Sequence, residues 1–236
     1  MRYTKIGDIA LVRIPEHLEH QEYEIAREIL HKEHHIRVVL RKFERYGEFR
    51  KRKVKILIGD RTDTIHTEFG ARVRIDLKDT YFSEREKTER QRLKDLVCDN
   101  EKILIPFGGV GIIPLIIAKE KSVDITAVEK NEKAFLLMKE NITRNTLKGS
   151  ITPVLQDVYT FKNGTFDRVI VPQPYRHSSF DTVISSCRKE GFLHYYTWIA
   201  TKQKLPVFPG VVILRTKHLF SYAPGVTKVC IDMQKL

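Results

Sequence analysis

A glycine-rich turn followed by an acidic residue is the most informative local pattern in the chain. The apolar run Ile103–Pro106 is typical of a buried strand and leads directly into Phe107-Gly108-Gly109-Val110-Gly111. Glycines there let the backbone approach a ligand, and the helix that follows can present free N–H groups. Glu129 lies twenty residues beyond Gly109, after the expected strand Asp124–Val128, where a carboxylate can accept both hydroxyls of a ribose. The pattern predicts a nucleoside-containing cofactor, and the absence of a Walker-type lysine argues against a P-loop.

Two further strand ends carry residues that could contact this cofactor. Asp157 follows the expected strand Ile151–Leu155, where its carboxylate could accept the exocyclic amine of an adenine or simply cap the next segment. Pro172-Gln173-Pro174-Tyr175 follows the expected strand Arg168–Val171. Ligands of open α/β sheets bind outside the carboxyl ends of strands, so this loop either faces the reactive end of the cofactor or is only a rigid turn.

A basic segment gives the chain much of its positive charge. Arg41–Lys55 contains eight Lys or Arg and two Glu, a net charge of +6 out of +12 for the whole chain. Three aromatic residues, Phe43, Tyr46 and Phe49, are interleaved with these cations. Cations bind phosphates and aromatic rings stack on unpaired bases, so the segment could hold a nucleic acid. The alternative is a solvated β-hairpin whose aromatic rings face its own core.

The elements that must position these residues differ between the two parts of the chain. The first part reads as mixed α+β, with strand-like runs at Asp8–Ile14 and Ala71–Leu77 and a helical pattern at Glu19–Glu33. From Glu84 onward a charged helix is followed by alternating short strands and helices, including a helix around Phe180–Arg188. This alternation predicts a doubly wound α/β sheet. We therefore expect a small α+β domain at residues 1–79 and a larger α/β domain at residues 80–236.

Composition excludes several classes of protein. A hydrophobic content of 42% with 31% charged residues argues against a largely disordered chain, and no apolar run approaches the ~20 residues of a membrane span. The three widely spaced cysteines indicate neither a disulfide framework nor a zinc site. The group His31, His34 and His35 falls at a helix end and lacks further ligands at metal-binding spacing. We expect an intracellular protein with no metal site, no secretion signal and no membrane segment.

The order of short motifs along the chain supports a resemblance to a known family. The motifs are Gly47-Glu48-Phe49-Arg50, Thr64-Ile65-His66-Thr67-Glu68-Phe69-Gly70, Tyr81-Phe82-Ser83-Glu84-Arg85, Thr88-Glu89-Arg90, the glycine turn, Val128-Glu129-Lys130-Asn131, Asp167-Arg168-Val169-Ile170, His194-Tyr195-Tyr196 and Ser221-Tyr222-Ala223-Pro224. In this order they resemble the archaeal and eukaryotic tRNA guanine-37 N1-methyltransferases. The resemblance implies a Rossmann-like class I methyltransferase domain that uses S-adenosylmethionine, preceded by a small domain that helps to hold the tRNA anticodon stem-loop. It also implies a cytoplasmic enzyme, which we expect to be a monomer without the extra N-terminal domain of many members.

The resemblance assigns roles to individual residues. Glu89 matches the general base that removes the N1 proton of guanine, and Arg50 matches the arginine that stabilises the charge developing on the base. Guanine N1 is a poor nucleophile until it is deprotonated, so a carboxylate and a guanidinium suit these roles. The cofactor pocket is expected to include Tyr81, Arg85, Phe107, Gly109, Gly111, Glu129, Lys130, Asp157 and Pro172.

Several positions depart from the family pattern. Pro172 stands where the family has the asparagine of its catalytic loop, and Glu84 stands where it has a proline. Gln173-Pro174-Tyr175 faintly resembles the loop of amino-methyltransferases, and Glu129-Lys130-Asn131 resembles the sister family of aminocarboxypropyl transferases in wyosine-type tRNA modification. His194-Tyr195-Tyr196 is more similar to the methyltransferases. The alternatives are therefore aminocarboxypropyl transfer and a tRNA-binding homologue with impaired catalysis.

Overall fold

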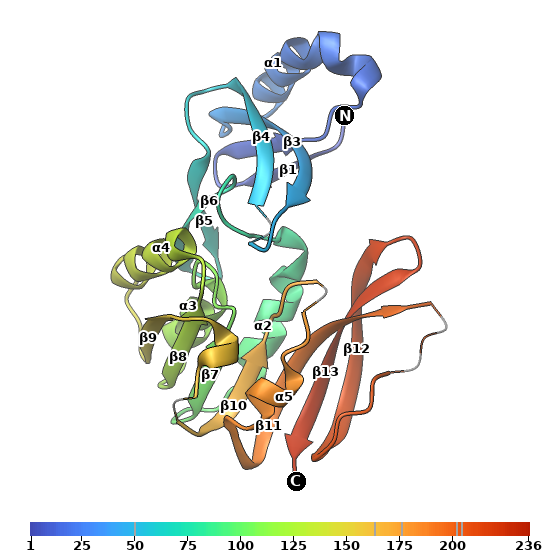
Figure 1. Ribbon diagram of the computed structural model, residues 1–236. Coiled ribbons are helices and arrows are strands. Elements are labelled where there is room, and N and C mark those ends of the chain that lie inside the picture. The colour runs from blue at the N-terminus through green and yellow to red at the C-terminus, as the bar shows by residue number, and fades with distance from the viewer. Residues whose placement is uncertain (50, 163, 176, 202, 204) are drawn as a thin grey trace. The chain divides into compact units, whose positions relative to one another are not determined.

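The computed structural model describes residues 1–49, 51–162, 164–175, 177–201, 203 and 205–236 (Figure 1). The chain forms two compact units, Met1–Glu84 and Arg85–Leu236. None of the described helices is both long enough and apolar enough to cross a lipid bilayer.

The N-terminal unit is built on a four-stranded sheet in the order β1-β2-β3-β4. Its strands are β1 (Tyr3–Ile6), β2 (Ile9–Val12), β3 (Val38–Tyr46) and β4 (Lys51–Ile58). The 3-10 helix η1 (Glu16–Gln21) and helix α1 (Glu22–Lys32) connect β2 to β3, which run parallel. Apolar residues of α1, such as Ala26 and Ile29, pack on Val12 and Val39 in one core. A separate two-stranded sheet follows, β5 (Asp63–Glu68) with β6 (Ala71–Asp76).

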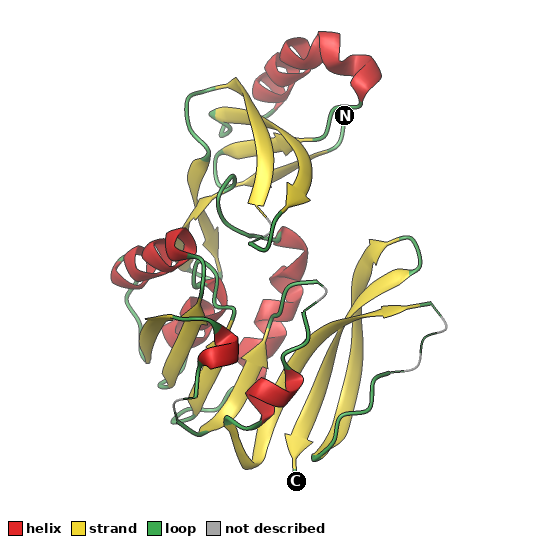
Figure 2. Ribbon diagram, viewed as in Figure 1, coloured by secondary structure: helices red, strands yellow, loops and turns green. Residues whose placement is uncertain are grey.

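The C-terminal unit contains a seven-stranded sheet in the order β12-β13-β11-β10-β7-β8-β9. The strands are β7 (Lys102–Pro106), β8 (Asp124–Glu129), β9 (Ser150–Leu155), β10 (Phe166–Val171), β11 (Cys187–Ala200), β12 (Val211–Ala223) and β13 (Val226–Lys235). The helices are α2 (Lys87–Leu96), α3 (Ile112–Glu120), α4 (Glu132–Thr143) and α5 (Phe180–Ile184), with the 3-10 helices η2 (Glu84–Glu86) and η3 (Val158–Thr160). Figure 2 shows how strands predominate in the last part of this unit.

Strand direction and order confirm the predicted fold class. Strands β9, β8, β7, β10 and β11 are mutually parallel, and β13 pairs antiparallel with both β11 and β12. The chain leaves β7 toward β8 and β9, then returns to the other side of β7 to form β10. That reversal is the topological switch point of a doubly wound sheet, where ligands bind at the carboxyl ends of the strands.

Alternate residues of the strands supply the two cores of this unit. On β7, Ile103 and Ile105 pack with α2 and α3 residues such as Leu93 and Ile117, whereas Leu104 faces the other core. This period of two is what a strand covered on both faces requires.

One local expectation was wrong. The helix expected around Phe180–Arg188 ends at Ile184, because Phe166 N–H donates to the Ser186 carbonyl (2.9 Å) and Phe166 pairs with Cys187. The backbone at 186–187 therefore bonds to β10 as the start of β11 and cannot continue a helix. The motif Thr64–Gly70 carried no predicted element, and most of it forms the strand β5, Asp63–Glu68.

Candidate active site

The glycine turn lies at the switch point, between β7 and α3. Gly108 N–H donates to the Val128 carbonyl (2.8 Å), which ties the turn to the end of β8. Gly111 precedes α3 with a φ of 86°, and a Cβ there would lie 2.8 Å from Cγ of Met138. Only glycine avoids both the left-handed backbone penalty and this clash. Gly109 is also left-handed (φ 58°), but a Cβ there would meet no atom within 4 Å, so space beside the turn is open.

Glu129, at the end of β8, is held by backbone N–H groups on both of its oxygens. Oε2 accepts Gly109 N–H (2.7 Å) and Oε1 accepts Asn131 N–H (2.7 Å). Burial raises the pKa of Glu129, and these N–H groups only partly oppose it. A carboxylate has about four acceptor sites, so Glu129 keeps acceptor capacity for a hydroxyl group beside these backbone donors. The oriented carboxylate and the open space beside Gly109 fit the ribose of a nucleoside cofactor.

Lys130 and Asp157 are brought together at the next strand end. Lys130 Nζ lies 3.0 Å from Asp157 Oδ2, and Asp157 Oδ1 accepts Tyr159 N–H (3.0 Å) as the cap of η3. The N–H of Tyr159 and the ammonium of Lys130 hold the pKa of Asp157 below its usual value. The capping interpretation of Asp157 is therefore observed, and its proposed contact with adenine stays a prediction.

An aromatic group lies next to the turn. The ring of Phe107 meets His177 edge-on with centroids 6.0 Å apart, and Tyr159 stacks on His177 at 6.4 Å. These rings come from the segments that follow β7, β9 and β10. Flat apolar surfaces of this kind suit a purine ring. Phe107 was predicted in the pocket, whereas Tyr159 and His177 were not, because neither lies in a recognised motif.

The loop after β10 is held by Gln173 rather than by Pro172. The Gln173 side chain is buried, and its Oε1 accepts the Ser179 hydroxyl (2.9 Å) and the Tyr195 hydroxyl (3.2 Å). Pro172 is partly buried and offers no side-chain amide. Among the described residues, Gln173 Nε2 has no hydrogen-bond partner. The carboxamide that the family pattern places at 172 is thus present one residue later, where it stiffens the loop.

Glu89 is buried on α2 within a cluster of donors. Arg92 Nε lies 2.9 Å from Oε2, the Tyr196 hydroxyl donates to Oε1 (2.7 Å) and Lys217 Nζ donates to Oε2 (3.0 Å). Burial raises the pKa of Glu89, but the hydrogen bonds from Arg92, Tyr196 and Lys217 outweigh it and hold the pKa below its usual value. Glu89 is therefore an ionised carboxylate at neutral pH, able to accept a proton.

The remaining predicted site residues are dispersed. Arg85 is exposed, with its guanidinium 5.7 Å from the ring centroid of Phe220. Tyr81 is partly buried in the N-terminal unit, and Arg50 lies outside the described residues. The structure thus groups Gly109 with Glu129 and Lys130 with Asp157, while Glu89 is bound by residues that the sequence interpretation did not select.

The basic segment forms the β3–β4 hairpin, and one of its cations has a different role from the one expected. Arg41 is 3% exposed and pairs with Glu22 (2.8 Å) and Glu19 (2.7 Å), so it is not available to a phosphate. Burying a guanidinium requires such partners. Phe43 and Tyr46 are exposed rather than turned into a core, and Lys53 is exposed with its Nζ 5.7 Å from the Phe43 ring centroid. The hairpin therefore presents both aromatic rings and cations to solvent.

Two family matches cover nearly the whole chain. Residues 64–211 match the TRM5/TYW2 methyltransferase domain, and residues 1–62 match the TYW2 N-terminal domain.

Two similar relatives differ in the activity that their names describe. The chain is 30% identical to the tRNA(Phe) (4-demethylwyosine(37)-C(7)) aminocarboxypropyltransferase of Methanocaldococcus jannaschii, over 98% of this chain and 97% of that protein. It is 34% identical to the tRNA (guanine(37)-N(1))-methyltransferase Trm5b of the same organism, over 84% of this chain but only 59% of that protein. The solved structure of Pyrococcus horikoshii TYW2 in complex with MeSAdo has a TM-score of 0.85 and 25% identity, over 99% of this chain and 90% of that one.

Proposed function

Because the chain belongs to the TRM5/TYW2 methyltransferase family, we propose that it transfers a group from S-adenosylmethionine to the base at position 37 of a tRNA. We further propose that the group is the methyl group and that the acceptor is N1 of guanine. The observation that carries this proposal is the buried Glu89 carboxylate, held ionised by Arg92, Tyr196 and Lys217. The name of the relative Trm5b describes that reaction.

The proposed mechanism begins with removal of the guanine N1 proton by Glu89. The N1–H bond breaks, an O–H bond forms on the carboxylate, and the electron pair left on N1 becomes the nucleophile. Negative charge then spreads to the base oxygen, where a guanidinium is the suitable partner, and we propose Arg50 for this role. S-adenosylmethionine supplies the electrophilic methyl group.

The residues at the carboxyl ends of the strands are proposed to hold the cofactor. Glu129 would accept the ribose hydroxyls, and Gly109 and Gly111 would allow the backbone to approach it closely. Phe107 would cover the adenine. Further pocket contacts are proposed from Tyr81, Arg85, Lys130, Asp157 and Pro172. This arrangement is supported by the likeness to the TYW2 structure, which was solved in complex with MeSAdo.

The tRNA is proposed to bind through its anticodon stem-loop to the small N-terminal domain, residues 1–79. The exposed cations and aromatic rings of the β3–β4 hairpin support this, since phosphates and unpaired bases are the groups they would contact. The names of both activity classes of relatives include tRNA position 37.

A second candidate is transfer of the aminocarboxypropyl group of the same cofactor. Three observations favour it. Residues 1–62 match the TYW2 N-terminal domain, and Pro172 stands where the resemblance to N1-methyltransferases implies an asparagine. The aminocarboxypropyltransferase relative is also matched over nearly its whole length, unlike Trm5b.

Differential labelling of the cofactor separates the two candidates. The protein would be incubated with tRNA and S-adenosylmethionine labelled either in the methyl carbon or in the aminocarboxypropyl carbons, followed by mass analysis of the nucleosides. Methyl label on guanine is expected. Label from the aminocarboxypropyl carbons would replace the leading proposal by the second, and binding of tRNA with neither label would indicate a homologue without catalysis.

Substitution of the proposed base provides the residue-level test. Glu89→Gln keeps the shape of the side chain but cannot accept a proton, so the single-turnover rate should fall by ~10²–10⁴-fold with little change in tRNA affinity. Asp95→Asn is the matched control, because Asp95 is an exposed acid on the same helix that accepts a local hydrogen bond from Gln91 (2.8 Å). A normal rate for Glu89→Gln would show that Glu89 has a structural role only.

A further inference from the structure

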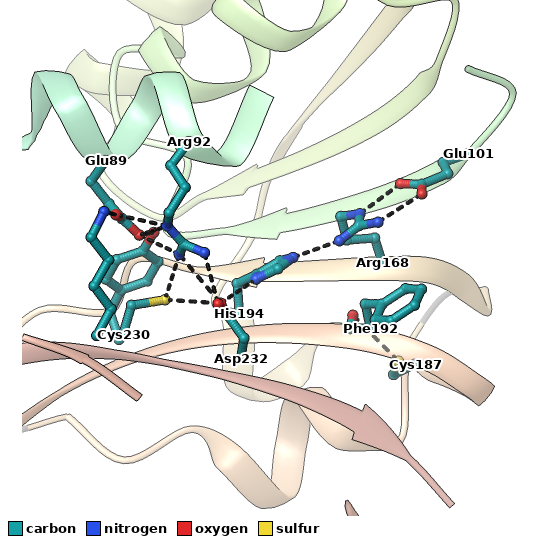
Figure 3. A network of polar contacts seen from close by, with 11 residues as sticks. Glu89, Arg92, Glu101, Arg168, Cys187, Phe192, His194, Cys230 and Asp232 are labelled. Atoms are coloured by element: carbon teal, nitrogen blue, oxygen red, sulfur yellow. Dashed lines mark hydrogen bonds and ion pairs between the residues drawn. The ribbon is translucent and has the colours of Figure 1, made fainter. Parts of the chain in front are cut away.

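An ionic network of buried and partly buried side chains extends from Glu89 across the C-terminal unit (Figure 3). Its members, in order of contact, are Lys217, Glu89, Arg92, Asp232, His194, Arg168 and Glu101. They come from α2, β10, β11, β12, β13 and the segment before β7. Apart from His194, cations and anions alternate along this ionic network, so that each charge has an opposite charge as a neighbour.

The central histidine is neutral, and its tautomer follows from its neighbours. Arg168 can only donate, so the His194 Nε2 atom that lies 2.6 Å from Arg168 Nη1 is an acceptor without a proton. The proton is then on Nδ1, which donates to Asp232 Oδ1 (2.6 Å). Burial lowers the pKa of His194 and Arg168 lowers it further, although Asp232 opposes both. With a neutral imidazole, three cations balance three carboxylates.

Arg92 is the only described member of this network that contacts two carboxylates on different elements. Its Nε and Nη2 atoms face Glu89, and its Nη1 lies 2.7 Å from Asp232 Oδ2. The guanidinium is rigid and planar, so its position on Asp232 fixes where it meets Glu89. Asp232 is in turn held by His194, and hydrogen bonds and opposite charges lower the pKa of Asp232 to about 2 despite its burial.

A metal ion does not fit this cluster. Ligand atoms of His194, Cys230 and Asp232 lie within 4.8 Å of one another, which by itself resembles a metal site. However, Arg92 Nη2 lies 3.3 Å from Cys230 Sγ and 3.2 Å from Asp232 Oδ1. A guanidinium, which cannot be deprotonated in a protein, already occupies the position of the cation.

We propose that Arg92, anchored by Asp232 and His194, is a positioning residue that orients the Glu89 carboxylate and keeps it ionised for proton removal. The inference rests on the proposed function in one respect, that Glu89 is the base. Arg92 supplies the hydrogen bonds and positive charge that water would otherwise provide to the buried Glu89 carboxylate. Its contact with Asp232 holds the Arg92 side chain in one rotamer, so the position of the guanidinium does not shift with Glu89. The acid limb of the pH–rate profile is then set partly by β11 and β13, far from α2 in the sequence.

The first experiment measures the pKa of Glu89 without any substrate. Carbon-13 NMR of protein labelled at the glutamate carboxyl carbon would be recorded over a pH series, with the Glu89 signal assigned by its loss in Glu89→Gln. Arg92→Met removes the cation and leaves Asp232 uncompensated, and both changes raise the pKa of Glu89. Arg92→Lys keeps the charge but lacks the planar fork, so the pKa should fall between those of the wild type and Arg92→Met.

Lys94→Met is the matched control, because Lys94 is a buried cation on the same helix that pairs with Glu120 (2.8 Å). It should destabilise α2 without moving the Glu89 titration. If Arg92→Met does not fold, Arg92→Lys carries the test. An unchanged Glu89 titration in folded Arg92 variants would overturn the proposal.

The second experiment compares single-turnover rates over the same pH range. In Arg92→Met the rate below neutral pH should fall by about tenfold or more and recover as pH rises, following the titration of Glu89. Asp232→Asn should lower the rate at every pH while tRNA affinity changes little, because it loosens the anchor. If the Glu89 pKa shifts in the NMR titration but the pH dependence of the rate does not change, Glu89 is not the base. That result would overturn the catalytic part of the proposal and leave the NMR result intact. Absence of any transferred group would refute only the proposed function.

Discussion

Glu129 and Glu89 are both sequestered carboxylates, yet their neighbours move their pKa values in opposite directions. Among the residues that the structure describes, Glu129 receives backbone N–H groups alone, and burial raises its pKa. At Glu89 burial acts in the same sense, but hydrogen bonds from Arg92, Tyr196 and Lys217, two of them cations, outweigh it and lower the pKa. Such separation of pKa values is a common sign of two different tasks. Here it favours a hydrogen-bond acceptor for hydroxyl groups at Glu129 and a proton acceptor at Glu89.

Replacement of Glu129 tests the position of the cofactor pocket. Glu129→Ala removes the proposed acceptor of the ribose hydroxyls, so S-adenosylmethionine binding should weaken by roughly 2–4 kcal/mol. Calorimetry measures this directly, with Glu132→Ala as a control that removes an exposed acid from the start of α4. Because hydroxyls donate to the ionised carboxylate and the pKa of Glu129 is raised, wild-type affinity should also decrease on acidification. Equal affinities of the wild type and Glu129→Ala would place the pocket elsewhere.

At the scale of elements, the sequence predicted the parts whose signal is local. The run Ile103–Pro106, the glycines after it and Glu129 each lie within one βαβ unit, so their spacing alone brought Gly109 and Glu129 together. The end of α5 could not be predicted in this way, because it depends on the pairing of Phe166 with Cys187, 21 positions away.

The contacts around Glu89 depend even more strongly on residues that are distant in the sequence, and so could not be predicted from local patterns. Asp232 lies 140 positions from Arg92, and no local pattern of α2 indicates that contact. The sequence likewise predicted Arg41 to be a surface cation, because its partners Glu19 and Glu22 lie on other elements, η1 and α1. Composition shows that charge is present, whereas only tertiary pairing shows which charges are neutralised.

The β3–β4 hairpin gives a prediction at this scale. If Lys51, Arg52 and Lys53 contact the tRNA backbone, binding releases condensed counterions, and the logarithm of affinity falls steeply with the logarithm of salt concentration. The triple alanine variant should flatten this slope by about 0.7–0.9 for each phosphate that is no longer neutralised. Filter binding over a salt series measures it. A variant with alanine at Lys133, Lys139 and Lys189 removes the same charge from the C-terminal unit, and an equal change of slope in the two variants would exclude a specific role for the hairpin.

For the whole molecule, the ionic network around Glu89 makes stability depend on pH. His194 has a lowered pKa in the folded state, so below its usual range near 6.5 the unfolded chain takes up a proton that the folded state refuses, and stability falls as pH falls. Asp232 and Glu89 also have lowered pKa values, and their contributions are lost at still lower pH. Glu129 acts in the opposite sense, because its raised pKa lets the folded state hold a proton more tightly.

Urea unfolding at pH 7.5 and pH 5.5 would test whether His194 dominates this balance. The fluorescence of Trp198, the single tryptophan of the chain, reports on the C-terminal unit through its position on β11. We expect the unfolding free energy of the wild type to be lower at pH 5.5. His194→Gln has no titratable ring, so the difference between the two pH values should shrink even though the variant is less stable at both. His35→Gln, which removes an exposed imidazole from the other unit, should leave the difference unchanged. If the difference in unfolding free energy between the two pH values persists in His194→Gln, the pH dependence comes from the carboxylates and not from His194.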